Sequence, residues 1–223
     1  MKKFFAIALT VLVALTTVSA QSQKDIFKER KQMAKLTKTE LDKRASKAAR
    51  AAAKTYAKQK WAVPVGALPL EKQLDKAYNM QYQFETADLP MYVMGEATAI
   101  GQNYDAAKMQ ALELAKINLA GQMQTEITAL IESSVANEQI SSNDAASISK
   151  SVMSSKSLIS QTLGRVIPVV ECYRDTNNGM KEVRVQVAYS YKAAADAARS
   201  IVKAELEKSS QNLAKQLDQV LGF

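Results

Sequence analysis

The chain has 223 residues, a formal net charge of +8, one cysteine and no histidine. The absence of histidine excludes Ser-His-Asp and Cys-His catalytic arrangements and removes the commonest metal ligand. There is no P-loop or dinucleotide-binding glycine pattern, and one thiol cannot form an internal disulfide. The composition therefore argues against an enzyme, predicts no metal or cofactor, and directs attention to binding surfaces.

Residues 1–20 have the pattern of a secretory signal peptide. Two lysines precede an apolar run, and Val18 and Ala20 stand at −3 and −1 of an expected cleavage site before Gln21. A membrane-anchoring helix is the alternative, but the run from 4 to 18 is shorter than the ~20 residues that cross a bilayer. No cysteine stands at the cleavage point. We therefore expect an exported, unlipidated protein in the periplasm, at the outer membrane or outside the cell.

The basic excess is concentrated in residues 21–60, which hold 13 basic and 4 acidic residues, whereas residues 61–223 hold 15 and 18. We interpret this segment as a helical arm. Thr37 and Glu40 form a capping box, which predicts a helix from there to about Lys60. One face is rich in alanine and holds Leu41, Ala45, Ala48, Ala52 and Tyr56. The opposite face is cationic and holds Lys43, Lys47, Arg50, Lys54 and Lys58.

The arm has three alternative roles. Its alanine face suits packing against another helix of the protein or of a partner, because it buries too little apolar area to hold a membrane. Its cationic face would contact an anionic envelope surface or an envelope protein. Nucleic acid is disfavoured, because few aromatic residues alternate with the charges. The candidate partner-binding residues are Lys43, Lys47, Arg50, Lys54, Lys58 and Trp61.

Residues 61–89 are predicted to form an extended connector and a short helix from 71 to 84. The aromatic side chains in and near this stretch have two alternative readings. They pack in the core, or they provide stacking surfaces for a glycan or for peptidoglycan. The four residues concerned are Trp61, Tyr78, Tyr82 and Tyr92.

Residues 90–198 have the pattern of an α+β domain with a small antiparallel sheet, in the order strand, helix, helix, strand, strand, helix, with helices on one face. In the first strand, small residues such as Gly95 and Ala97 would let a helix lie close to the sheet. Asn103 caps the long helix that follows. A serine-rich helix comes next, with a mobile link as the alternative. The late strands flank the turn "TNNG". Cys172 is expected to be buried and inert, with a free reactive thiol or an intermolecular bridge as the alternative.

The last helix is predicted to run from 193 to 221, so that residues 199–223 extend it beyond the sheet. Its apolar stripe would pack against the arm or against a second copy of the chain, as in a coiled coil. The stripe consists of Val202, Leu206, Leu213, Leu217 and Val220.

Three acidic residues around the hairpin, Glu171, Asp175 and Glu182, are the candidates for acid–base chemistry. Such chemistry would require two of them to face each other across a cleft. Exposed hairpin acids usually serve solubility, and we expect that role here.

Three stretches resemble the LPP20 family of bacterial envelope proteins over residues 92–198. They are "GEATAIGQNYDAAKMQALELAKINLAGQM", the serine-rich middle, and "VVECYRDTNNGMKEVRVQVAYSY". The resemblance implies a small α+β module of the periplasm or outer membrane without catalytic residues, related to a flagellar outer-membrane accessory domain. The chain departs from the family in lacking a lipidated cysteine and in carrying the basic arm.

Together these patterns predict a non-enzymatic structural or interaction protein of the cell envelope that binds a partner through helical surfaces. A binding module for an envelope polymer or glycan is the alternative. It would use the basic arm and the aromatic residues.

Overall fold

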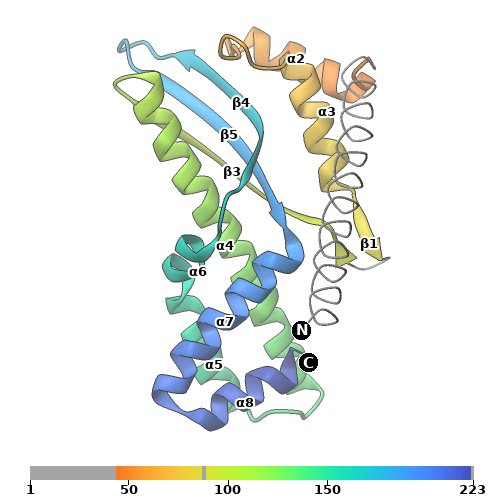
Figure 1. Ribbon diagram of the computed structural model, residues 1–223, viewed down its shortest axis with the longest axis vertical. Coiled ribbons are helices and arrows are strands. Elements are labelled where there is room, and N and C mark those ends of the chain that lie inside the picture. The colour runs from red at the N-terminus through yellow and green to blue at the C-terminus, as the bar shows by residue number, and fades with distance from the viewer. Residues whose placement is uncertain (1–43, 87–88, 222–223) are drawn as a thin grey trace, which may run out of the picture. The chain divides into compact units, whose positions relative to one another are not determined.

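The centre of the structure is a sheet of three antiparallel strands in the order β3–β5–β4, with β3 at Tyr92–Gly101, β4 at Ile167–Asp175 and β5 at Lys181–Ser190. The computed structural model describes residues 44–86 and 89–221 (Figure 1). The predicted signal peptide, the arm from 21 to 43 with Lys43, and the capping box lie outside the described residues. β4 and β5 form the predicted hairpin, whose turn uses Gly179 at a φ of +72°.

Helix α4 (Tyr104–Ala136) covers one face of the sheet and begins at the predicted cap, where Asn103 Oδ1 accepts a hydrogen bond from the amide of Ala106. The contact with β3 is very close. A Cβ atom added to Gly95 would lie 2.3 Å from the carbonyl oxygen of Ala115. The prediction that small strand residues admit a helix is therefore confirmed.

The opposite face of the sheet is covered by α2 (Lys47–Lys58) and α3 (Leu70–Gln81). Their apolar residues, including Ala49, Leu74 and Ala77, pack together with Val170 of β4 and Ala188 of β5. The α+β class is confirmed. The prediction of helices on one face concerned residues 90–198; the helices on the opposite face, α2 and α3, come from residues 47–81, ahead of that segment.

The start of α2 differs from the helix that we predicted from Thr37 to Lys60. The described chain is not helical from 44 to 46, and α2 is capped by Ser46, whose hydroxyl accepts from the amide of Ala49. The amide of Ser46 in turn donates to Asp75 Oδ1 of α3 at 3.0 Å. A tertiary contact thus fixes the helix start, and the chain from Ala45 onward belongs to the same compact unit as the sheet.

Beyond the sheet, α4 is surrounded by four shorter helices (Figure 1). They are α5 (Ser142–Ser154), α6 (Lys156–Thr162), α7 (Tyr191–Ser209) and α8 (Gln211–Val220). The serine-rich segment is therefore helical, as predicted, but it forms two helices that meet at Ser155 instead of one. None of the helices in residues 44–86 and 89–221 has the length and apolar character that a membrane crossing requires.

The predicted single helix from 193 to 221 is wrong. It breaks at Ser210, which is extended at φ −161° and caps α8 with its side chain. Asp218 on α8 pairs with Arg199 at 2.7 Å and with Lys203 at 2.6 Å, both on α7. Much of the apolar stripe is buried in the chain's own core, with Val202, Leu206 and Leu217 each fully buried. The helix break lets the stripe pack on the chain itself, so it does not extend as an open coiled-coil surface.

Both edges of the sheet are bound by side-chain amides. Gln122 and Asn118 of α4 donate to the carbonyl oxygens of Met94 and Glu96 on β3, each at 2.7 Å. On β4, Gln73 accepts from the amide of Glu171 at 2.7 Å. These bonds, together with the bridge between Ala62 and Tyr173, engage part of each edge and leave fewer backbone groups free to pair with a foreign strand. A short pair, β1 (Phe84–Thr86) with β2 (Leu89–Pro90), lies outside this sheet.

Replacing Gly95 with alanine is expected to lower the free energy of unfolding by about 1–3 kcal/mol, because the new methyl group meets a backbone carbonyl that cannot move alone. Urea denaturation measures the change. Gly164→Ala is the control, since its Cβ would lie 3.6 Å from the Tyr189 hydroxyl, an ordinary contact. Equal stability of the two variants would contradict the packing described here.

Replacing Asp218 with asparagine is expected to destabilise the α7–α8 turn by no more than about 1 kcal/mol, the range for partly exposed ion pairs. Hydrogen bonds from Lys203 and Arg199 lower the pKa of Asp218 in the folded chain. Its stabilising effect is therefore full above the pKa of the unfolded chain and is lost as the pH falls through the lowered value. Denaturation midpoints of wild type and variant should differ at neutral pH and converge in acid.

Candidate functional site

The outward face of α2 is cationic. Lys47, Lys54 and Lys58 are exposed, whereas Arg50 is half-buried and donates from Nε to the carbonyl of Ala45 at 3.1 Å. The chain from 44 to 60 contains six basic and no acidic residues. Among residues 44–86 and 89–221, no carboxylate forms an ion pair with the three exposed lysines. We call Lys47, Lys54 and Lys58 the α2 lysine face.

Trp61, predicted as part of the partner surface, is buried with 8% of its surface exposed. The chain turns back after α2. The amide of Trp61 donates to the carbonyl of Tyr56, and the amide of Lys60 donates to the carbonyl of Ala57, both at 3.0 Å. This is a Schellman-type helix end, which brings the residue beyond it onto the last turn. The rings of Tyr56 and Trp61 are 6.2 Å apart.

Two arginines of the hairpin cover these rings. The guanidinium of Arg174 lies 4.6 Å from the Trp61 ring centre, and that of Arg184 lies 5.3 Å from the Tyr56 ring centre. Each also pairs with a carboxylate, Arg174 with Glu182 and Arg184 with Glu96. Guanidinium groups stack well on aromatic faces. The arginines are therefore committed to joining α2 to the sheet.

Cys172 lies on the same face of β4 and is fully buried. Burial raises the pKa of its thiol to about 12, with smaller and opposing effects of the neighbouring charges. A thiol is reactive as the thiolate. The predicted buried cysteine is thus confirmed.

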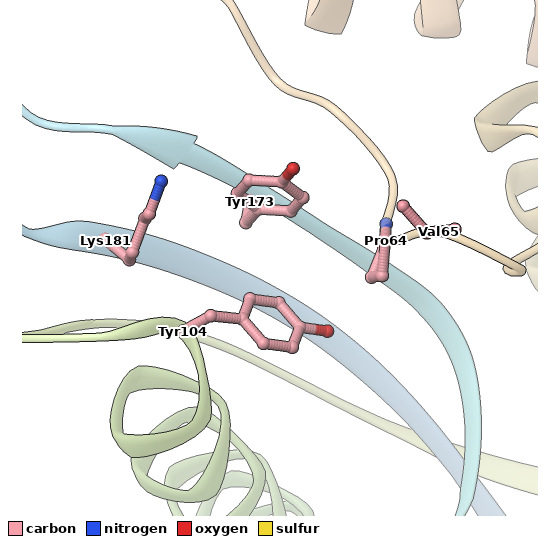
Figure 2. Close-up of a pocket in the computed structure, with 5 residues that line it drawn as sticks. All are labelled: Pro64, Val65, Tyr104, Tyr173 and Lys181. Atoms are coloured by element: carbon pink, nitrogen blue, oxygen red, sulfur yellow. The ribbon is translucent and has the colours of Figure 1, made fainter.

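The α4 side of the hairpin holds a hollow that the sequence analysis did not identify (Figure 2). It is lined by Tyr104 at the start of α4, Tyr173 on β4, Lys181 on β5, and Pro64 and Val65 on the connector. The two tyrosine rings meet edge to face, 5.4 Å apart. Alternation along β4 places Tyr173 on this side, but only the fold brings Tyr104 and the connector to it.

The three hairpin carboxylates are divided between the two faces of the sheet, and each has a cation partner. Glu171 accepts from the hydroxyl of Tyr104 and pairs with Lys108 at 2.7 Å, and Asp175 pairs with Lys181. Glu182 pairs with Arg174 at 2.6 Å. Because Glu171 lies opposite Val185 and Glu182 lies opposite Arg174, these two carboxylates are on different faces of the sheet. Burial raises the pKa of Glu171.

The aromatic residues predicted as stacking surfaces do not line one groove. Tyr78 and Tyr92 pack against the core between the sheet and α3. Tyr82 is exposed over 72% of its surface, and Trp61 is buried under Arg174. The sequence shows which residues are aromatic, but their spacing did not tell which of them are buried in the core and which are exposed.

No family model, curated protein or solved structure matches the chain. The LPP20 resemblance therefore stays a prediction from sequence. In the part of the chain that the structure describes, no group of three or more Cys, Asp or Glu residues is arranged to hold a metal ion. The site features that remain are the α2 lysine face and the tyrosine-lined hollow.

Replacing Lys60 with glycine is expected to stabilise the protein by about 0.5–1 kcal/mol, because Lys60 occupies the left-handed position of the helix end that glycine favours. Its φ is +65°. Lys58→Gly is the matched control: it removes the same charge inside the last helical turn and should destabilise by about 0.5–1 kcal/mol. Thermal or urea unfolding of both variants tests these opposite signs, and a shared sign would contradict the geometry.

Proposed function

We propose that this chain is a non-enzymatic interaction protein of the cell envelope that contacts an anionic lipid surface through the α2 lysine face. The observation that carries the proposal is the orientation of α2. Its alanine face packs against α3 and the sheet, which leaves Lys47, Lys54 and Lys58 outward. A helix held in this way presents its charges at fixed positions.

The proposal favours binding by charge over insertion of apolar side chains. The apolar side of α2 is occupied by Ala49, Ala52 and Ala53 packed within the protein. Much of the apolar stripe of α7 and α8, which we expected to serve a partner, is buried as well. These two surfaces therefore offer little apolar area to enter a bilayer or to pair with a second copy.

The expected affinity of the α2 lysine face for an anionic membrane is modest. A lysine next to an anionic membrane contributes about 1 kcal/mol, so the three lysines together contribute about 3 kcal/mol before losses. Screening over ~8 Å at physiological salt limits this attraction to direct contact. Lys60, which is exposed just beyond α2, would add to it.

The placement in the envelope rests on the sequence. The predicted signal peptide supports export, and the resemblance to the LPP20 family supports a periplasmic or outer-membrane location. The paired hairpin carboxylates support a role without catalysis, since each already has a cation partner. An envelope protein with an acidic surface is the alternative partner for the same lysines.

Reversing the α2 lysine face in the variant Lys47→Glu, Lys54→Glu, Lys58→Glu is expected to weaken binding to vesicles that contain phosphatidylglycerol by at least about tenfold, because attraction is replaced by repulsion. Co-sedimentation of the purified chain with such vesicles measures the change. Arg50 is left intact because it bonds to the helix start.

The matched control is Lys150→Glu, Lys192→Glu, Lys215→Glu. These exposed lysines of α5, α7 and α8 give the same change in net charge at other places on the surface. The control should retain vesicle binding to within about threefold, and added salt should abolish binding of the wild type. Equal losses in both triple variants, or equal binding to phosphatidylcholine vesicles, would refute the α2 surface.

A further inference from the structure

The hollow lined by Tyr104, Tyr173 and Lys181 has a volume of about 320 Å³, at the lower end of the range for small-molecule pockets (Figure 2). We propose that it binds a neutral pyranose ring of an oligosaccharide. The hollow lies on the α4 face of the sheet, whereas the α2 lysine face belongs to the layer on the other side. The two proposals therefore stand or fall separately.

The tyrosine rings are held in place before any ligand arrives. The backbone of Tyr173 exchanges two hydrogen bonds with Ala62, each at 2.8 Å, which fixes the connector to the outer edge of β4. The hydroxyl of Tyr104 donates to Glu171, which Lys108 also contacts. Rigid aromatic surfaces lose little entropy on binding. The apolar C–H side of a pyranose packs on such a ring.

The rim of the hollow carries a donor and an acceptor side by side. Lys181 pairs with Asp175, and its ammonium lies 5.6 Å from the ring centre of Tyr173. Neighbouring hydroxyls of a sugar accept from an ammonium and donate to a carboxylate. Hydrogen bonds to charged groups are stronger than those between neutral groups. A ring stacked on Tyr173 would bring its hydroxyls toward this pair.

The charges favour a neutral ligand over an anionic one. Lys181 is already neutralised by Asp175, and Lys108 by Glu171. An anion would therefore meet two carboxylates without a cation to spare at either pair. A wholly apolar ligand would bury the charged rim without hydrogen bonds, which is costly. A polyhydroxylated ring can form hydrogen bonds with Lys181 and Asp175 at the rim and cover the tyrosine rings at the same time.

The test is a titration of the full chain with chitotetraose, cellotetraose and xylotetraose, followed by amide chemical shifts in nuclear magnetic resonance spectra. At least one of these sugars should give saturable shifts centred on residues 62–66, 104 and 173–181. Tyr173→Leu removes the ring but keeps an apolar side chain, and it should weaken that binding by about tenfold or more. Tyr82→Leu, at an exposed tyrosine on α3's C-terminal side, should leave it unchanged.

Two further measurements keep the proposal falsifiable. Should Tyr173→Leu fail to fold, Lys181→Met replaces it, because this variant keeps the tyrosines and removes the rim donor; it should also weaken binding. Inorganic phosphate at the same concentration should leave the pocket amides unshifted. Absence of shifts with all three sugars up to tens of millimolar, shifts outside the pocket, or a stronger response to phosphate would overturn the assignment.

Discussion

The structure depends on the close approach of β3 to α4. At Gly95 the strand has no side chain on the helix side, and the backbone of Ala115 and the Cβ of Leu119 come up against it. This contact orients the 33-residue helix along the sheet. One end of α4 then places Tyr104 beside the hairpin, and the other end provides the surface on which α5 to α8 pack (Figure 1).

The hairpin of β4 and β5 contributes side chains to a different contact on each face of the sheet. On one face, Arg174 and Arg184 stack on Trp61 and Tyr56 and so tie α2 to the sheet. On the other face, Tyr104 and Tyr173 meet beside Lys181. Side chains alternate across a strand, so one hairpin supplies both arrangements. The bridge between Ala62 and Tyr173 links the two, because it holds the connector that follows α2 against β4.

The residues that hold α2 on the sheet are different from those that α2 exposes to solvent. The hairpin arginines and the two rings beneath them are used internally, where stacking and ion pairs fix geometry, while Lys47, Lys54 and Lys58 of α2 stay in solvent. Lysine is strongly hydrated and flexible, which suits loose contact with a charged surface, whereas arginine suits fixed stacking. The α2 lysine face and the tyrosine-lined hollow lie on opposite sides of the sheet, so the two binding roles that we propose for them are independent.

The sequence by itself determined the local features. Alternation in β5, the cap at Asn103, the small residues of β3 and the turn before Lys181 each depend on neighbours within a few positions, and all four appear in the structure. The sequence also identified the cationic face of α2 but assigned Trp61 to it wrongly. Exposure of an aromatic ring depends on what lies above it, here Arg174, which is 113 positions away.

Only the tertiary structure decided where α2 begins, where α7 ends and what the helices pack against. Ser46 starts α2 because Asp75 of α3 binds its amide, and Ser210 ends α7 so that Asp218 returns to Arg199 and Lys203. Apolar periodicity predicts that a stripe will be buried, but it does not say against what. The burial of the C-terminal stripe within the same chain, and the meeting of Tyr104 with Tyr173, follow from contacts between distant segments whose free energy no local pattern encodes.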